Sequence, residues 1–532
     1  MNTIDAATLR GWLVDGEEIA LLDAREEGVF FDDHLFHAAC IPLSRVELDL
    51  PRLVPRRDTR VVWCDDGDSH LAARAAEVAS ELGWSACCVL NGGVRAWRDG
   101  GGELYSGVNV PSKAFGEHVE HAFDTPRIPA SQLQEMLEAG DDVIVLDSRP
   151  VNEYVRMTIP TSIDCPGAEL VHRAIGMAPD PDTLVVVNCA GRTRSIIGAQ
   201  SLINAGLPNE VVALENGTMG WELAGYQVEK GQTRYADDPS DDTTEWALQA
   251  ADDVAVRFGV EAIDVATLND WQADSSRTTY LLDVRTPEEY ETGHMPGSRW
   301  AAGGQLVQAT DEYVATRNAR LVLVDDNGVR ATMTASWLRQ LGWDDAVVLD
   351  GGLEGQLETG PEPSVAVVTD APSISVDELA AALDDPSTVV VDLATSLDHR
   401  DKGHIPGSFW AVRSRLDEAA RYVADTGVTP ATVVVASFDD DLSRCAQLDA
   451  SAAWPDAAVW SLAGGTRAWA AAGHSMETGN DRATTDTNDV WYKPYDLKGQ
   501  NPPEEDMQAY LTWEVALVDQ LDRDDTVFFP EF

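Results

Sequence analysis

The stretch 90–97, LNGGVRAW, recurs along the chain and decides the fold. Related octapeptides stand at 214–221 (LENGTMGW), 349–356 (LDGGLEGQ) and 462–469 (LAGGTRAW), and each follows a short apolar run. A buried strand, a tight turn and a helix explain the pattern, because glycine adopts the positive φ that such a turn needs. The sequence therefore predicts four copies of one structural unit.

A second motif lies upstream of the glycine turn in every copy. Two copies also share a third motif, GHMPGSRW at 293–300 and GHIPGSFW at 403–410. Short apolar strands that alternate with helical patterns predict a parallel sheet covered by helices on both faces. The upstream motif reads LLDAREEGVF from Leu21, VLDSRPVNEY from Val145, LLDVRTPEEY from Leu281 and VVDLATSLDH from Val390.

The spacing of these motifs divides the chain into four repeats and a tail. We place the repeats at 1–110, 120–236, 245–365 and 371–480, and a linker with a C-terminal helix at 481–532. We expect an α/β fold in each repeat, with a mostly parallel sheet flanked by helices.

The tail lies outside the repeat motifs and shows a helical pattern. Met507, Tyr510, Leu511, Val518 and Leu521 share one helical face. We expect this helix to dock on the repeats as a structural element.

Composition limits the functions that the chain can have. The 532 residues carry a net charge of −53, which repels nucleic acid and anionic membranes. No apolar run reaches the length of a membrane helix, and the N-terminus shows no secretion signal. Seven cysteines without a CxxC pair indicate a reducing, cytoplasmic setting and argue against disulfides or structural zinc. We expect neither a metal nor a cofactor.

The motif order LDxR…EY…GHxPGS…LxGGxxAW resembles the rhodanese (thiosulfate sulfurtransferase) family, present four times in about 480 residues. The resemblance implies four tandem rhodanese-like domains. It also implies a catalytic cysteine that heads a six-residue loop. In repeat 2 that loop runs from Cys189 to Arg194.

The residues of this loop suit sulfur transfer on physical grounds. A thiol attacks as its thiolate, and the loop amides, a helix N-terminus and two arginines are expected to lower the pKa of Cys189. The same groups suit thiosulfate, a compact dianion. The predicted catalytic residue is Cys189, and the predicted substrate-binding residues are Ala190, Gly191, Arg192, Thr193, Arg194 and Arg149, the last of which could equally be a structural ion-pair partner.

The expected reaction is a double displacement. The Cys189 thiolate attacks the outer sulfur of thiosulfate, sulfite leaves and a persulfide remains. Cyanide or a cellular thiol then removes that sulfur, and a protein could also act as the acceptor. The preformed thiolate requires no histidine base, and Ser195 is expected to cap the following helix.

The other three repeats lack a cysteine at the matching position. Cys189 lies 17 residues before Gly206, and the same count from Gly342 leads to Asp325. We expect repeat 3 to be inactive because it holds Asp325 at this position. In repeat 4 the corresponding strand ends near Ser437 and Cys445 falls inside the next helix, so we expect this repeat to be inactive as well. In repeat 1 the count from Gly83 leads to Asp66, while Cys64 lies in an acidic loop. Three aspartates around that thiol favour an inactive repeat 1 and leave the role of Cys64 open.

Three other functions compete with thiosulfate sulfurtransfer. Relatives that use 3-mercaptopyruvate tend to have a small uncharged loop, so two arginines favour thiosulfate. A cysteine-dependent phosphatase or arsenate reductase resembles Cys-x5-Arg, whereas Cys189 to Arg194 is Cys-x4-Arg. A sulfur-relay or binding scaffold could coexist with catalysis, with the cysteine-free repeats holding a partner.

Overall fold

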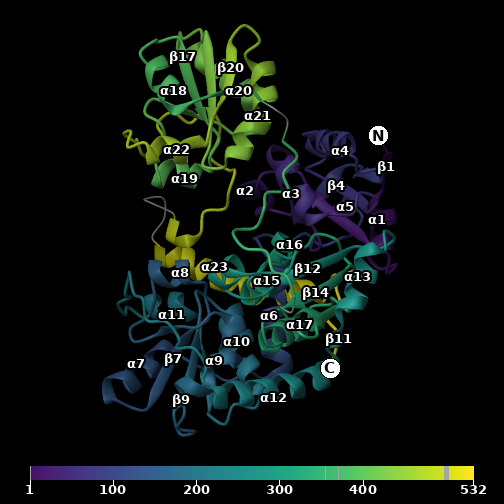
Figure 1. Ribbon diagram of the computed structural model, residues 1–532, viewed down its shortest axis with the longest axis vertical. Helices are drawn as coiled ribbons and strands as arrows, with labels where there is room; N and C mark the ends of the chain where they lie inside the picture. Colours follow the sequence, from purple (N-terminus) through teal and green to yellow (C-terminus); the bar gives the residue numbers. More distant parts are fainter. Residues whose placement is uncertain (1, 354, 369–370, 497–502) are drawn as a thin grey trace. The chain divides into compact units, whose positions relative to one another are not determined.

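A computed structural model describes residues 2–353, 355–368, 371–496 and 503–532 (Figure 1). In these ranges the chain forms four five-stranded sheets, one in each repeat. The paired strands run parallel, as the alternation of strands and helices predicts. The predicted α/β fold is thereby confirmed. We call the four repeats domains 1 to 4.

Domain 1 opens the chain. Its strands are β1 (Asn2–Ile4), β2 (Ile19–Asp23), β3 (Ala39–Cys40), β4 (Arg60–Cys64) and β5 (Cys87–Leu90). Its helices are α1 (Ala6–Leu13), α2 (Glu27–Phe30), η1 (Leu43–Arg45), α3 (Val46–Leu53), α4 (Leu71–Glu81) and α5 (Gly93–Asp99). The strand order β1-β5-β4-β2-β3 recurs with the corresponding strands in the other three domains.

Domain 2 holds the cysteine loop. Its strands are β6 (Arg127–Ile128), β7 (Val143–Asp147), β8 (Ile163–Asp164), β9 (Leu184–Asn188) and β10 (Val211–Leu214). The helices in and beside it are α6 (Val110–Phe123), α7 (Ala130–Ala139), α8 (Val151–Arg156), η2 (Gly167–Glu169), α9 (Leu170–Met177), α10 (Thr193–Asn204), α11 (Gly217–Leu223) and α12 (Asp241–Phe258).

Alternate residues of the domain 2 strands enter two separate cores. Val185 and Val187 face a core that α9, α10 and α12 complete, while Val186 faces a core with Leu133 of α7 and Trp221 of α11. Successive strand side chains point to opposite faces, so a sheet covered on both sides needs an unbroken apolar run. The run LVVV in β9 meets this need.

Domains 3 and 4 repeat the plan. The elements of domain 3 are β11 (Ala262–Ile263), α13 (Val265–Ala273), β12 (Thr279–Asp283), α14 (Pro287–Thr292), β13 (Arg299–Trp300), α15 (Gly303–Gln308), α16 (Thr310–Tyr313), β14 (Arg320–Val324), α17 (Val329–Gln340) and β15 (Ala346–Leu349). Those of domain 4 are β16 (Ser373–Ile374), α18 (Val376–Ala382), β17 (Thr388–Asp392), α19 (Ser396–Asp401), β18 (Phe409–Trp410), η3 (Arg413–Arg415), α20 (Leu416–Asp425), β19 (Thr432–Ala436), α21 (Asp440–Ala453), β20 (Ala458–Leu462) and α22 (Gly465–Ala471).

The predicted C-terminal helix is present. It is α23 (Pro503–Leu521), preceded by the short η4 (Pro494–Asp496). Met507 and Leu511 are buried with Met219 of α11, so the helix docks on domain 2. No helix within the described residues is long and apolar enough to cross a bilayer.

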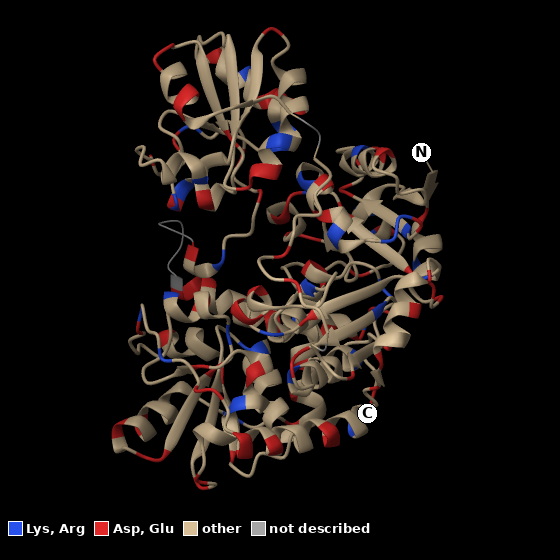
Figure 2. Ribbon diagram, viewed as in Figure 1, with Lys and Arg blue, Asp and Glu red and all other residues tan. Residues whose placement is uncertain are grey.

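The described chain forms two compact bodies. The first contains Met1–Leu9, Leu21–Val108 and Ser364–Lys493, which is most of domain 1 together with domain 4. The second contains Arg10–Ala20, Asn109–Pro363 and Pro494–Phe532, and so holds domains 2 and 3 with α23. Acidic residues occur in every domain (Figure 2), in line with the net charge of −53.

Packing explains the glycine at the fourth position of each LxGGxxAW motif. Gly217 has a φ of +53°, and a Cβ there would lie 2.5 Å from the carbonyl oxygen of Cys189. The same glycine in the other domains meets the carbonyl of the matching loop residue, including the domains without a cysteine there. This glycine is therefore required by the fold and not by catalysis.

A second glycine brings domains 2 and 3 together. A Cβ on Gly303, the first residue of α15, would clash with the Thr334 hydroxyl and lie 2.9 Å from the Cβ of Ala168. A Cβ on Gly304 would lie 3.0 Å from the backbone nitrogen of Gly167. The two domains therefore meet through nearly bare backbone at this point.

Replacing Gly303 by alanine is expected to lower the free energy of unfolding by about 1–3 kcal/mol, because the interface has no room for a methyl group. Urea denaturation followed by tryptophan fluorescence measures the change. Gly11→Ala is the matched control, since Gly11 lies inside α1 and a Cβ there meets nothing within 4 Å. This control should gain about 0.5–1 kcal/mol. Equal effects from both variants would contradict the packing argument.

Candidate active site

The residue that follows the central strand β9 has a counterpart in each domain. The N–H of Ser148 donates to the carbonyl of Asn188, the last residue of β9, over 2.9 Å. The same bond joins Ala24 to Cys64, Val284 to Val324 and Leu393 to Ala436. The next residue along the chain is therefore the equivalent position, and it is Asp65 in domain 1, Cys189 in domain 2, Asp325 in domain 3 and Ser437 in domain 4.

The structure corrects the position inferred for domain 1. Counting from Gly83 led to Asp66, whereas the backbone hydrogen bonds show that Asp65 occupies the position in domain 1 that Cys189 occupies in domain 2. The loop before α4 is longer than the loop before α10, which displaces the count. Cys64 is the last residue of β4 and corresponds to Asn188. Burial and the charge of Asp23 raise the pKa of this thiol well above its ordinary value.

The Cys189 thiol lies at the end of a chain of hydrogen bonds inside domain 2. Its Sγ donates to Oγ of Ser195 over 3.5 Å, and that hydroxyl donates to the carbonyl of Arg192 over 2.8 Å. Ser195 is the third residue of α10 and does not cap it, because its hydroxyl donates instead of accepting an N–H. Cys189 is only 2% exposed, so its thiol is shielded from bulk water.

The predicted lowering of the Cys189 pKa is wrong in its net direction. Burial raises the pKa of the thiol above its ordinary value and outweighs the opposing effects of Arg194 and of the hydrogen bonds from Ser195. The carboxylate of Glu514 raises it further. The resting group is therefore a neutral thiol at neutral pH.

Alkylation of Cys189 should accordingly follow an alkaline profile. The thiolate fraction grows as pH rises through the raised pKa, so the rate with iodoacetamide should still increase above pH about 8.5, the ordinary value for a free cysteine. Mass spectrometry of the peptide that carries Cys189 gives the rate at each pH. Arg194→Gln should move the midpoint further up, because it removes a charge that favours the thiolate. A midpoint near neutrality would contradict the geometry.

Arg192 is paired with two glutamates of α6. Its guanidinium donates to both carboxylate oxygens of Glu117, over 2.6 and 2.7 Å, and to Glu120 over 2.6 Å. Arg192 and Glu117 are buried, and this pair ties the loop to α6. These carboxylates neutralise the positive charge of Arg192, which the sequence predicted to act on Cys189.

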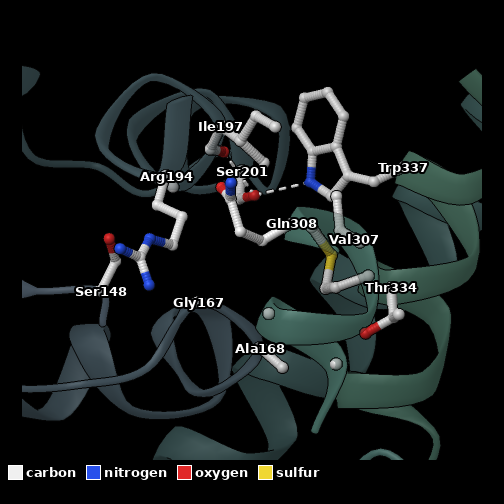
Figure 3. Close-up of a pocket in the computed structure, with 14 residues that line it drawn as sticks. Ser148, Gly167, Ala168, Arg194, Ile197, Ser201, Val307, Gln308, Thr334 and Trp337 are labelled. Atoms are coloured by element: carbon white, nitrogen blue, oxygen red, sulfur yellow. Dashed lines mark hydrogen bonds between the residues drawn. The ribbon is translucent and has the colours of Figure 1, made fainter. Parts of the chain in front are cut away.

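Arg194 lies nearer to the chemistry. It donates to Glu153 of α8 over 2.8 Å and to Gln305 of α15 over 3.1 Å, and its charge interacts directly with Cys189. Figure 3 shows Arg194 beside Ser148 at a cavity between domains 2 and 3. The cavity measures about 30 Å³, which is enough to hold water.

Arg149 forms the ion pair that the sequence left open as an alternative to substrate binding. Its guanidinium donates to both oxygens of Asp147, over 2.8 and 2.7 Å, and to the carbonyl of Met157 over 2.6 Å. All three groups are buried in domain 2. Ala190 contributes its carbonyl to the N–H of Met219 over 3.0 Å, which joins the loop to α11.

The C-terminal helix α23, yellow in Figure 1, packs against α6, α11 and the cysteine loop. Thr193 donates its hydroxyl to Oε1 of Glu514 over 2.6 Å. A Cβ on Gly191 would lie 3.3 Å from Oε2 of Glu514 and 3.3 Å from a ring carbon of Tyr510. The tail was expected to be structural only, and it places a carboxylate against the loop.

Sequence reasoning missed Glu514 for a specific reason. Glu514 lies on α23, which has no counterpart in the four repeats, so no comparison within the chain marks it. Glu514 lies on the apolar face itself, seven residues after Met507 and three after Leu511, so an acid within this apolar pattern was the signal that could have identified it.

The aspartates of domains 1 and 3 occupy the place of the sulfur. The carboxylate of Asp325 accepts the N–H groups of Gly328 and Ala331 in its own loop. Asp65 accepts those of Gly67 and Ala72 over 2.8 and 3.0 Å. Each loop therefore keeps its cradle of N–H groups and fills it with a fixed carboxylate, which cannot carry a sulfane sulfur. Cys445 is buried in the core of domain 4, as its helical position predicts.

Known proteins match the chain both domain by domain and as a whole. The Rhodanese-like domain model matches residues 5–99, 129–224, 264–358 and 375–472. A solved structure described as a thiosulfate sulfurtransferase from Pseudomonas aeruginosa is 48% identical, covers 100% of each chain and has a TM-score of 0.94.

Curated relatives match single domains. An HTH-type transcriptional regulator of Mycobacterium tuberculosis is 34% identical over 104 residues, which is 20% of this chain and 45% of that protein. The thiosulfate sulfurtransferase GlpE of Pseudomonas paraeruginosa is 33% identical over 76 residues, which is 14% of this chain and 66% of that protein. The chain thus spans less than two thirds of the length of these relatives. With four domain matches covering well over half of its length, the chain belongs to the rhodanese family.

Proposed function

We propose that this protein is a sulfurtransferase that moves sulfane sulfur from thiosulfate to a thiophilic acceptor through a persulfide on Cys189. One observation carries the proposal: of the four equivalent loop positions, all described, only the one in domain 2 holds a thiol. The names of the full-length structural relative and of one curated relative support thiosulfate as the donor.

The reaction has two steps whose atoms balance. The Cys189 thiol loses its proton, and the resulting thiolate attacks the outer sulfur of thiosulfate. The S–S bond of the donor breaks with its electron pair on sulfite, and the thiol proton leaves on the released sulfite as hydrogensulfite. Cyanide or a cellular thiol then attacks the outer sulfur of the persulfide and restores the thiolate. A protein thiol is also a possible acceptor. A buried thiol supports this chemistry because the persulfide is shielded from bulk water.

Arg194 is our candidate for the cation that faces the donor. Its charge interacts with Cys189, and it is partly exposed, whereas Arg192 is buried against Glu117 and Glu120. Ala190, Gly191 and Thr193 shape the loop around the sulfur. The short Cys-x4-Arg loop continues to favour sulfur over a phosphoryl group.

The remaining domains are assigned a supporting role. A carboxylate or a hydroxyl at the position of the sulfur supports inactivity of domains 1, 3 and 4 in sulfur transfer. All seven cysteines lie in the described part of the chain and are free, which supports the expected reducing, cytoplasmic setting.

Loading of the protein with thiosulfate tests this function. Incubation should add one sulfur atom to the peptide that carries Cys189 and release one sulfite for each loaded chain, with no sulfur on the peptide that carries Cys64. Subsequent addition of cyanide should produce thiocyanate and remove the added mass. Loading on Cys64, or no loading on Cys189 while thiocyanate still forms, would refute the assignment.

A further inference from the structure

We propose that Glu514, on the C-terminal helix outside the four repeats, carries the proton from an acceptor thiol to the sulfane sulfur held on Cys189. The inference rests on the proposed function and assigns a residue to its second step. It gives α23 a part in the chemistry beyond covering domain 2.

The position of Glu514 is the first observation. Its Oε1 accepts the Thr193 hydroxyl over 2.6 Å, and its Oε2 faces Gly191, both in the loop that begins with Cys189. Among the residues that the structure describes, Oε2 has no hydrogen-bond partner. Glu514 is 1% exposed, and leaving a carboxylate oxygen without a partner at such depth is costly. A functional role explains why the fold keeps this cost.

The other carboxylates near the loop are already occupied. Glu117 directs both of its oxygens at Arg192, over 2.6 and 2.7 Å. Glu153 directs both of its oxygens at Arg194, over 3.1 and 2.8 Å. An acid held in such a pair cannot exchange a proton readily, so Glu514 is the carboxyl group available to the loop.

The hydroxyls and arginines of the loop itself do not carry the proton. The Ser195 hydroxyl is bound to the carbonyl of Arg192, and the Thr193 hydroxyl is bound to Glu514 itself. Arginine does not release its proton in proteins. Since Cys189 is 2% exposed, bulk water is also a poor source.

Transfer to a thiol requires this proton and transfer to cyanide does not. An acceptor RSH and the persulfide anion give RSSH and the Cys189 thiolate. The RSH proton passes to the Glu514 carboxylate, and the carboxyl group then gives this proton to the outer sulfur of the persulfide. The RS⁻ that was formed attacks the outer sulfur. The S–S bond to Cys189 breaks, and its electrons stay on Cys189. Cyanide anion and the persulfide anion give thiocyanate and the thiolate, and no proton moves.

The charges around Glu514 suit a proton carrier. Burial raises the pKa of its carboxyl group, and Glu117 of α6 raises it further. Lys113 of α6, the Thr193 hydroxyl and Arg192 of the loop act in the opposite direction. The charge of Glu514 in turn acts on Cys189 of the loop and on Tyr510 of α23. A pKa nearer to neutrality than that of an exposed carboxyl favours both steps of a relay.

Discharge of the preformed persulfide tests the proposal in the full-length protein. Wild type, Glu514→Gln and Glu505→Gln are loaded with sulfur. They are mixed with 2-mercaptoethanol at neutral pH, where the thiol carries its proton, or with cyanide at an alkaline pH where cyanide is the anion. Intact-protein mass follows the loss of the sulfur. Glutamine keeps the acceptor for Thr193, and Glu505 is an exposed acid on the same helix, so the two variants differ in the position that matters.

We expect Glu514→Gln to slow discharge to the thiol by about 10²-fold, to leave discharge to cyanide within about twofold, and to remove the acid limb of the pH profile for thiol discharge. Glu505→Gln should behave as wild type in both. A thiol rate equal to wild type in Glu514→Gln would overturn the proposal. An equal loss with both acceptors would also overturn it, because a structural role affects both.

The test of Glu514 does not depend on thiosulfate being the sulfur donor. Inorganic polysulfide loads the persulfide independently of thiosulfate. If only polysulfide loads Cys189, the proposed donor is wrong, and the discharge experiment still measures the role of Glu514.

Discussion

Replacing Cys189 by serine is expected to lower thiosulfate:cyanide turnover by at least about three orders of magnitude, because the covalent carrier of sulfur is lost. A serine hydroxyl is nearly isosteric with the thiol and can keep the contact with Ser195, so the loop should keep its shape. Thiocyanate formation by the full-length variant measures the loss. Unchanged circular dichroism would exclude unfolding as its cause.

Cys64→Ser is the matched control for this variant. Cys64 is as buried as Cys189, but it ends strand β4 and occupies the place of Asn188. We expect turnover within about twofold of wild type, since that residue has no role in the proposed chemistry. Full activity in Cys189→Ser, or loss of activity in Cys64→Ser, would move the active site to domain 1.

Replacing Arg330 by methionine is expected to lower the free energy of unfolding by about 3–5 kcal/mol, since it removes a fully buried guanidinium from a cluster that includes the buried carboxylate of Glu169. Arg330 is fully buried in α17 and donates to three carboxylates, those of Glu169, Glu289 and Asp326, over 2.7–3.1 Å. Glu169 belongs to domain 2, so the same side chain fastens domain 3 to domain 2. Urea denaturation followed by tryptophan fluorescence measures the change.

An exposed pair provides the comparison. Arg421 and Asp417 form an ion pair with both side chains more than 70% exposed, at 71% and 73%. Arg421→Met should change the free energy of unfolding by less than about 1 kcal/mol. A loss in Arg330→Met no larger than this would show that the buried cluster does not hold the domains together.

The pH dependence of this stabilisation has a definite sign. Burial acts to raise the pKa of Glu169, but the His172 ring, 3.8 Å away, and the charges of Arg330 and Arg173 outweigh it, and the pKa is lowered. A carboxyl group with a lowered pKa stabilises the fold above its ordinary pKa and loses this effect as the pH falls through the folded value. The difference between wild type and Arg330→Met should therefore be fully present at neutral pH and shrink in acid.

The sequence was sufficient to predict the fold because its signals are local and repeated four times. Runs such as LVVV, short and rich in β-branched residues, favour strands buried on both faces. Gly217 after β10 must be glycine because a Cβ there would clash with the carbonyl of Cys189. The spacing to the next glycine also located Asp325. It failed by one residue in domain 1, where the loop before α4 has a different length.

The site was predicted in part. Repetition within the chain identified Cys189 as the cysteine that heads a loop between strand and helix. The arginines were correctly placed in that loop, but their charge was taken as free for an anionic donor. The glutamates that neutralise Arg192 lie on α6, more than 70 residues earlier in the chain.

The sequence by itself therefore determined the four domains, their parallel sheets and the loop that carries the thiol. These follow from hydrophobic alternation and turn chemistry between neighbouring residues. Only the tertiary structure decided the electrostatics of that loop, because burial and the acids of other elements set the pKa of Cys189. It also placed Glu514 against Thr193, 321 residues away in the chain, where no local pattern could connect the two.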